Sequence, residues 1–309
     1  MIVTLAGGVG AARFLAGLLD VVPPGDVTAI VNVGDDFVLH GLSISPDLDT
    51  VTYTLAGEVD RQRGWGRADE TWLVMEELER YGGQTWFGLG DRDLALHLYR
   101  SQRRAEGATL SEITAEVARA KGLGVRLLPV TNDRLATKVV VPGEGELAFQ
   151  DWFVGRRHAL PVEAVRFDGA AESRPAPGVL DAIASADLVV VAPSNPVVSI
   201  APVLAVAGVG EAVRRRRDDV VAVSPIVGGR ALKGPAAELL STLGAGATAV
   251  GVARWYASEV GTLVIDELDT SLASEVAATG VRCVVTDTVM RDRAAAAALA
   301  RVVLGAVEP

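Results

Sequence analysis

Six short apolar runs, rich in valine and without polar alternation, constrain the fold of this chain more than any other feature. They are DVTAIVNV, DLVVVAP, DVVAVSP, TAVGV, TLVID and VRCVVTD, and most are separated by stretches with helical periodicity. A strand that is apolar on both faces is typical of a parallel sheet covered by helices on both sides. The runs therefore predict an α/β fold with a Rossmann-like, doubly wound and mainly parallel sheet.

The N-terminal segment TLAGGVGAARF predicts a strand over residues 2–6, a glycine-rich loop and then a helix near 11–21. The run ending in NVGDD provides the next strand, so the segment forms a βαβ unit of some 30 residues. The free N–H groups at the start of such a helix point at an anion.

The pattern changes in the middle of the chain. Residues 50–122 show helical stretches and few strand signals, with Asp91 as a helix cap and Thr109 and Glu112 as a capping box. TKVVVPGEGELAFQDWFV then predicts a small antiparallel hairpin. We expect a Rossmann-like nucleotide-binding core formed by residues 1–49 and 123–309, with 50–122 as a helical insertion.

The charge and composition exclude several classes of protein. The 39 acidic against 29 basic residues give a net charge of −10, which disfavours a nucleic acid polymer as partner. The runs of apolar residues are shorter than the ~18 that a membrane span needs, so we expect no membrane association. The single cysteine, Cys283, allows no internal disulfide, and we expect a cytoplasmic protein.

Small residues follow three of the predicted strands, where ligands of open parallel sheets bind. Because such loops and helix starts offer free amides, we predict a phosphate or nucleotide site. Its residues are Gly7, Gly8, Gly10, Ser194, Asn195, Pro196, Ser199, Gly228 and Lys233. The loop departs from the dinucleotide fingerprint, since Arg13 replaces the third glycine and Asn32 stands where a ribose-binding acid is expected.

Four carboxylates lie within fifteen positions after the second predicted strand: Asp35, Asp36, Asp47 and Asp49. Carboxylates at this density repel one another unless they are solvated, hydrogen-bonded or bridged by a cation. Mg²⁺ binds one or two carboxylates together with substrate phosphates. We therefore expect this acidic loop to bind Mg²⁺; a solvated acidic loop is the alternative.

Several stretches resemble the 2-phospho-L-lactate transferase family of coenzyme F-420 biosynthesis, nearly end to end and in order. They are GGVGAARFLAGL, ISPDLDTVTY, DRQRGWG, LGDRDLALH, PSNPVVSI, VAVSPIVGGRALKGPA and GVARWY. The resemblance implies transfer of a phosphoenolpyruvyl or 2-phospho-L-lactyl group from a guanosine diphosphate-linked donor to 7,8-didemethyl-8-hydroxy-5-deazariboflavin. GMP leaves, Mg²⁺ is required, and members are typically homodimers. The bacterial branch of the family takes the enolpyruvyl donor.

The resemblance also assigns roles to residues of this chain. Asp49 and Arg92 fall where the family contacts the deazaflavin, with Thr50, Trp65 and His97 as further candidates, and the helical insertion would cover this acceptor. Asp49 and Asp35 are the candidate catalytic residues. Asp49 either accepts the proton of the ribityl hydroxyl or binds the metal, and we favour Asp49 beside that hydroxyl and Asp35 on the metal.

Two other classes of protein remain open at the level of sequence. A non-catalytic, UDP-sugar-binding regulator of the related gluconeogenesis-factor family shares the opening glycine loop, but should lack the GDRD and SPDLDT pair. An NAD(P)-dependent oxidoreductase is disfavoured by Arg13 in the fingerprint.

Overall fold

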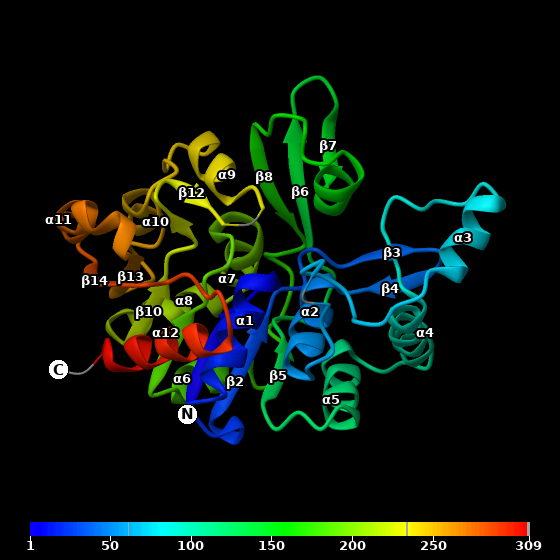
Figure 1. Ribbon diagram of the computed structural model, residues 1–309, viewed down its shortest axis with the longest axis horizontal. Coiled ribbons are helices and arrows are strands. Elements are labelled where there is room, and N and C mark those ends of the chain that lie inside the picture. Colours follow the sequence, from blue (N-terminus) through cyan, green and yellow to red (C-terminus); the bar gives the residue numbers. More distant parts are fainter. Residues whose placement is uncertain (61, 233, 308–309) are drawn as a thin grey trace.

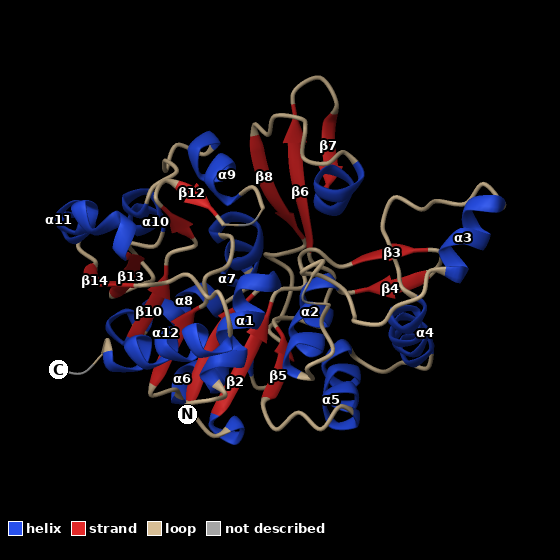
Figure 2. Ribbon diagram, viewed as in Figure 1, coloured by secondary structure: helices blue, strands red, loops and turns tan. Residues whose placement is uncertain are grey.

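The computed structural model describes residues 1–60, 62–232 and 234–307. Its centre is a parallel sheet of seven strands in the order β14-β13-β10-β9-β1-β2-β5 (Figures 1 and 2). These strands are β1 (Ile2–Ala6), β2 (Val27–Val31), β5 (Arg126–Pro129), β9 (Leu188–Val191), β10 (Val220–Val223), β13 (Thr262–Asp266) and β14 (Arg282–Thr286). Every residue of β1, β2, β9, β10 and β13 is buried, which is why these runs carry no polar alternation. The predicted Rossmann-like fold is confirmed.

The strand order reverses direction between β1 and β9. Because parallel crossovers are right-handed, the helices on the two sides of this point cover opposite faces of the sheet. α1 packs against α2 and α12, while α8 packs against α6 and α7. The helices of this core are α1 (Gly8–Leu18), α2 (Pro46–Leu55), α5 (Leu110–Ala120), α6 (Val179–Ser185), α7 (Ala201–Ala205), α8 (Val209–Arg215), α9 (Ala236–Thr242), α10 (Ala249–Trp255), α11 (Ala273–Ala278) and α12 (Arg293–Gly305).

Two lobes project beyond the carboxyl ends of the parallel strands (Figure 1). One is a three-stranded antiparallel sheet of β6 (Ala136–Val141), β7 (Gly145–Ala148) and β8 (Ala164–Asp168), with the π-helical turn η2 (Asp151–Gly155) between β7 and β8. The other contains the hairpin β3 (Phe37–Leu39) and β4 (Leu42–Ile44) with α3 (Leu73–Arg80) and α4 (Asp91–Ala105). We call it the acceptor lobe, after the sequence-based prediction that this region covers the acceptor. The predicted antiparallel hairpin is therefore present as β6–β7.

The helical region expected over 50–122 is distributed between the core and the acceptor lobe. α2 packs on α1 and α5 packs on β5, whereas α4 contacts β4. A small apolar cluster, separate from the main core, holds the acceptor lobe together. Its buried members are Leu39, Ile44, Met75, Leu89 and Leu94. The division of the chain at 50 and 122 remains a prediction.

Short connecting elements complete the description. They are η1 (Pro24–Asp26), η3 (Pro196–Ile200), η4 (Arg217–Asp219), η5 (Glu267–Leu272) and the hairpin β11 (Ile226–Val227) and β12 (Arg230–Ala231). Among the described residues, no single helix is long and apolar enough to span a bilayer. One bent pair, Pro196–Ala205 with Val209–Arg215, reaches that length and composition and turns by 95° at its break.

Three local predictions were wrong. The first helix begins at Gly8 rather than near residue 11, so it starts within the glycine loop, where Gly8 has a φ of 68°. TAVGV is not a strand but the start of α10, capped by the Thr248 hydroxyl, which accepts a hydrogen bond from Gly251 N at 3.1 Å. Asp91 does not cap its own helix: its carboxylate accepts the N–H groups of Leu73 and Val74, each at 3.2 Å, in the first turn of α3. The predicted capping box of Thr109 and Glu112 is confirmed.

Candidate active site

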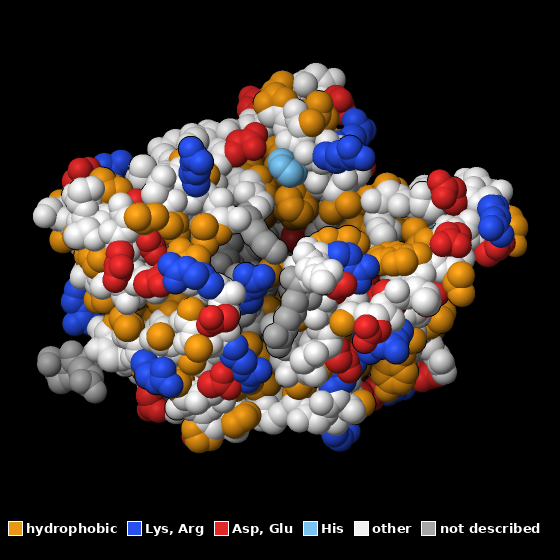
Figure 3. All heavy atoms as spheres, viewed as in Figure 1, with side chains coloured by type: hydrophobic (Ala, Val, Ile, Leu, Met, Phe, Trp, Pro, Cys, Tyr) orange, Lys and Arg blue, Asp and Glu red, His pale blue; other side chains and the backbone are white. Residues whose placement is uncertain are grey.

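A cleft of about 920 Å³ opens at the carboxyl ends of the parallel strands, between the acceptor lobe and the β6–β8 lobe. Figure 3 shows this face hollowed between the two lobes, with hydrophobic side chains gathered in the hollow. The cleft lies over the point between β1 and β9 where the strand order reverses, which is the usual ligand site of such sheets. Twelve of the predicted site residues line it: Gly7, Gly8, Gly10, Arg13, Asp35, Asp49, Thr50, Trp65, His97, Ser194, Asn195 and Ser199.

The floor of the cleft is the glycine loop at the start of α1. The Ser194 hydroxyl ties this loop to the end of β9, since it donates to the Gly7 carbonyl at 2.8 Å and accepts from Gly7 N at 3.3 Å. A Cβ on Gly7 would stand 2.6 Å from the Cβ of Ser199, so the loop passes that helix turn with no space for a side chain. The start of α1 therefore faces the cleft as a backbone surface suited to an anion.

Several other residues of the predicted nucleotide site hold neighbouring backbone or side chains in place or lie outside the cleft lining. Asn195 caps η3 by accepting from Val197 N at 2.9 Å, and Pro196 begins that turn, buried and outside the cleft lining. Asn32 is also buried outside the cleft lining, where its amide donates to Asp47 at 2.9 Å. Gly228 turns away from the cleft and donates its N–H to Asp269 at 3.0 Å. Lys233 lies outside the described residues.

Two buried carboxylates meet beside the glycine loop. Burial and the negative charge of Asp47 raise the pKa of Asp35 well above its ordinary value. Burial likewise raises the pKa of Asp47 to about 6, against the opposing hydrogen bonds from Asn32 and the Gly8 backbone. One buried oxygen of Asp35, Oδ1, has no hydrogen-bond partner. An unpartnered, buried oxygen next to a second carboxylate and an anion-binding loop fits a hard divalent cation such as Mg²⁺.

Asp47 is a residue that the predicted site set left out, although the acidic loop contained it. Its position in the sequence could have indicated it as a site residue. Pro46 begins α2, so Asp47 and Asp49 both fall in the first helical turn. There the helix packs on α1, which brings Asp47 to the glycine loop.

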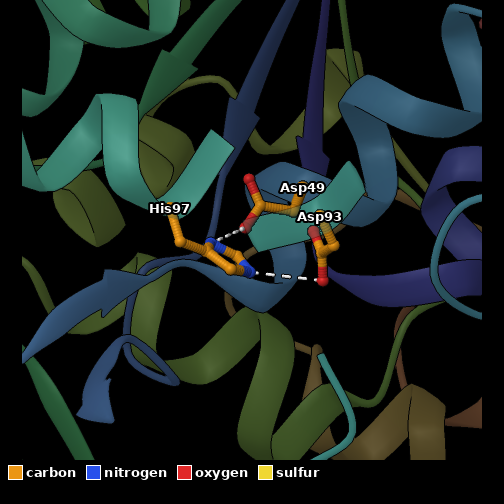
Figure 4. A group of neighbouring side chains, drawn as sticks. All are labelled: Asp49, Asp93 and His97. Carbon is orange, nitrogen blue, oxygen red and sulfur yellow. Dashed lines mark ion pairs between the residues drawn. The ribbon is translucent and has the colours of Figure 1, made fainter. Parts of the chain in front are cut away.

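Asp49 faces a different group of side chains (Figure 4). Asp49 of α2 lies with Asp93 and His97 of α4, and one ligand atom from each residue lies within 4.8 Å of the other two. Both oxygens of Asp49 are hydrogen-bonded to the guanidinium of Arg100, through Nη1 at 3.1 Å and through Nη2. Burial alone would raise the pKa of Asp93, but the contacts from His97 and the Tyr53 hydroxyl bring it below its ordinary value.

Aromatic side chains form the two upper walls of the cleft. In the acceptor lobe Trp65 lines the cleft, and the guanidinium of Arg63 lies 5.4 Å from its ring and 5.0 Å from the ring of Trp72. Trp86 and Phe87 continue this wall. Facing them, Phe149 and Phe153 stack at 5.3 Å between centroids and line the β6–β8 side.

The sequence interpretation missed Phe149 and Phe153 because FQDWFV extended the predicted hairpin. In the structure, β7 ends at Ala148 and η2 follows, which turns both rings toward the cleft. Arg92, the predicted acceptor contact, is exposed at the start of α4 and does not line the cleft; its backbone N–H donates to Glu70 at 2.7 Å.

The chain is thus a Rossmann-like α/β protein. Its cleft lies where the strand order of the sheet reverses and is surrounded by a glycine loop, an acidic cluster and aromatic walls. Comparison with known proteins then identifies its family. The chain belongs to the family described as "2-phospho-L-lactate transferase CofD", whose profile it matches over residues 2–304. The resemblance noted in the sequence is confirmed.

Relatives of known name cover almost the whole chain. Proteins named "Phosphoenolpyruvate transferase" from Streptomyces griseus and Streptomyces coelicolor are each 47% identical over 99% of this chain and 98% of their own length. One of the same name from Mycolicibacterium smegmatis is 41% identical over 97% and 96%. Among solved structures, a UPF0052-family protein from Bacillus halodurans aligns with a TM-score of 0.65 at 18% identity over 98% of both chains, which shows likeness of fold.

Proposed function

We propose that this chain transfers a phosphoenolpyruvyl group from a guanosine diphosphate-linked donor to 7,8-didemethyl-8-hydroxy-5-deazariboflavin in coenzyme F-420 biosynthesis. Membership of the CofD family supports transferase activity, and the names of the relatives favour the enolpyruvyl over the 2-phospho-L-lactyl donor. The observation that carries the proposal is the cleft itself, which has an anion-binding loop at its floor and aromatic walls above it.

In the proposed reaction the ribityl hydroxyl attacks the phosphorus atom that carries the enolpyruvyl group. A new P–O bond forms, the P–O bond to GMP breaks, the hydroxyl proton passes to solvent water, and the product is a phosphodiester. No covalent intermediate on the protein is required, because the substrate supplies the oxygen nucleophile. The protein then contributes alignment of the two substrates and charge for the diphosphate.

The donor diphosphate would lie on the glycine loop. Gly7, Gly8 and Gly10 bring backbone N–H groups to the cleft, with Ser194, Asn195 and Ser199 around them and Arg13 at the edge. The dipole of a helix start is worth only about 0.3–1 kcal/mol to an anion at an exposed site. That is too little to balance a diphosphate and the charge that develops on departing GMP.

A Mg²⁺ ion would supply that missing positive charge. Asp35 is the proposed first ligand because its Oδ1 is buried and unpartnered, and Asp47 is the proposed second because it lies between Asp35 and the loop. Asp49, which the sequence paired with Asp35, has both oxygens engaged by Arg100 and is proposed instead to face the acceptor hydroxyl.

The acceptor would enter between the aromatic walls. We propose that its ring stacks on Trp65, with Thr50 and His97 below it. Arg92 remains a proposed contact at the rim, and Arg92→Ala should then weaken acceptor binding more than donor binding. We also propose a cytoplasmic homodimer, as expected from the single cysteine and from the resemblance.

The proposal is tested by incubating the chain with Mg²⁺, the deazaflavin and each guanylated donor, and measuring GMP and product mass. The expected result is one GMP per new phosphodiester, faster with the enolpyruvyl donor. Faster turnover of the phospholactyl donor would reverse the donor assignment. Neither product, together with tight binding of UDP-N-acetylglucosamine, would replace the proposal by the regulator function.

A further inference from the structure

Helix α4 presents three polar side chains to helix α2 beneath the cleft. Asp93, His97 and Arg100 follow the spacing i, i+4 and i+7, which places them on one face of the helix. Asp49 and Tyr53, four residues apart on α2, meet that face. The two helices are therefore joined by polar contacts rather than by apolar packing alone.

Arg100 makes the largest share of these contacts. It is 4% exposed, and its guanidinium holds both oxygens of Asp49 while Nη1 also donates to the Ser43 carbonyl at 3.2 Å. Two parallel N–H···O bonds fix the plane of a carboxylate, which a single point charge does not do. The Asp49 carboxylate is thus held in one orientation at the cleft.

His97 continues the network toward Asp93. Its Nδ1 lies 3.2 Å from Arg100 Nη1, and because arginine only donates, Nδ1 is the acceptor of this contact. Nε2 lies 3.2 Å from Asp93 Oδ2 in a close contact outside hydrogen-bond geometry, and the other Asp93 oxygen accepts the Tyr53 hydroxyl at 2.5 Å. The series Tyr53, Asp93, His97, Arg100 and Asp49 begins and ends on α2.

We propose that Arg100 is a positioning residue for group transfer, which acts on the reaction only through Asp49. Arg100 does not line the cleft, whereas Asp49, Tyr53, Asp93 and His97 do. The inference rests on the proposed function, since it assigns Asp49 the task of aligning the acceptor hydroxyl. With both oxygens already accepting from Arg100, Asp49 acts as a fixed hydrogen-bond acceptor that aims the hydroxyl at phosphorus.

The test is a double-mutant cycle between Arg100→Lys and Asp49→Asn. Lysine keeps the positive charge but loses the two-point contact, so kcat should fall about 10- to 100-fold, as expected when a reacting group is misplaced by about 1 Å. The KM for the donor should change less than about twofold. The double variant should be no slower than Asp49→Asn alone, because without the Asp49 carboxylate there is no group for Arg100 to orient, and its replacement then has no further effect.

Arg103→Lys is the matched control on the same helix. Arg103 pairs with Glu116 and Glu106 on the outer side of α4, away from the cleft, so its kcat should stay within about twofold of wild type. Melting temperatures confirm that each variant is folded. If Arg100→Lys does not fold, Tyr53→Phe takes its place, with a smaller fall in kcat and the same lack of additivity with Asp49→Asn.

The outcomes distinguish failure of the proposed function from failure of the inference about Arg100. An unmodified chain that forms no product from either donor overturns the proposed function and this inference together. An active chain in which Arg100→Lys keeps the wild-type kcat, or in which the two substitutions multiply in full, overturns the inference alone. A purely structural role would lower the melting temperature without the selective loss of kcat.

Discussion

The backbone of Gly10 approaches the carbonyl of Pro193 so closely that a Cβ at Gly10 would stand 2.1 Å from that oxygen. The contact joins α1 to the residues that follow β9, directly below the cleft. Because the obstructing atom belongs to the backbone, neither partner can rotate away.

Gly10→Ala should therefore displace the loop from β9. Overpacking of this kind costs about 1–3 kcal/mol, so we expect urea unfolding to show a loss in that range. We also expect a higher KM for the donor, because the displaced amides line its proposed site. Gly25→Ala is the control, since nothing lies within 4 Å of its added methyl group. Equal stability of the two variants would contradict the close contact.

Magnesium should raise the melting temperature of the wild-type chain without any substrate. At a free Mg²⁺ concentration about 100 times the Kd, the expected stabilisation is about 2.7 kcal/mol. Asp35→Asn and Asp47→Asn should each abolish this rise, because each removes a proposed ligand of the cation.

Asp93→Asn distinguishes the two acidic groups in the same thermal-shift measurement. It alters the Asp49, Asp93 and His97 group but leaves Asp35 and Asp47 in place. We expect the magnesium-dependent rise to persist in this variant. If Asp93→Asn loses the rise and Asp35→Asn keeps it, the cation binds between α2 and α4 instead.

Replacing Trp65 should weaken acceptor binding. Trp65 is 48% exposed and lines the cleft, and an aromatic pair contributes about 0.5–1.5 kcal/mol beyond its buried area. Trp65→Ala should then raise the KM for the deazaflavin about 2- to 12-fold and leave the donor KM unchanged. Tyr81→Ala, a more exposed aromatic position on the outside of the acceptor lobe, should change neither constant. A larger change for Tyr81 would place the acceptor elsewhere.

The parallel sheet could be predicted from sequence because burial on both faces leaves a direct trace in strand composition. Val220–Val223 and Val189 with its neighbours are apolar throughout, as strands buried on both faces require. TAVGV misled for the same reason, since a buried helix start such as Ala249–Ala253 is equally apolar over five residues. Only Thr248, which caps the helix, distinguished a helix start from a buried strand.

The candidate site was predictable where loops follow strands and not where helices meet. Gly7 and Ser194 are adjacent in space because parallel strands end at one edge of the sheet. Arg100 sits in RSQRR, which reads as a solvated helical surface, and nothing local shows that one of these arginines is buried on Asp49. The pairing of α2 with α4 depends on how the acceptor lobe folds back, which spacing along the chain does not encode.

A final prediction concerns the contact that supports α1. Arg293 at the start of α12 donates to both oxygens of Asp20, just after α1, at 2.7 Å each, and this hydrogen bonding lowers the pKa of Asp20. The pair is partly exposed, so Arg293→Gln should cost less than about 1 kcal/mol at pH 7. A carboxylate whose pKa is lower in the folded state stabilises the fold above its unfolded pKa of 3.8 and loses that contribution as the pH falls through the folded value. The difference between wild type and Arg293→Gln in urea unfolding should therefore be constant from pH 7 to 5 and shrink below pH 4. A difference that grows on acidification would show that Arg293 stabilises α12 by some means other than Asp20.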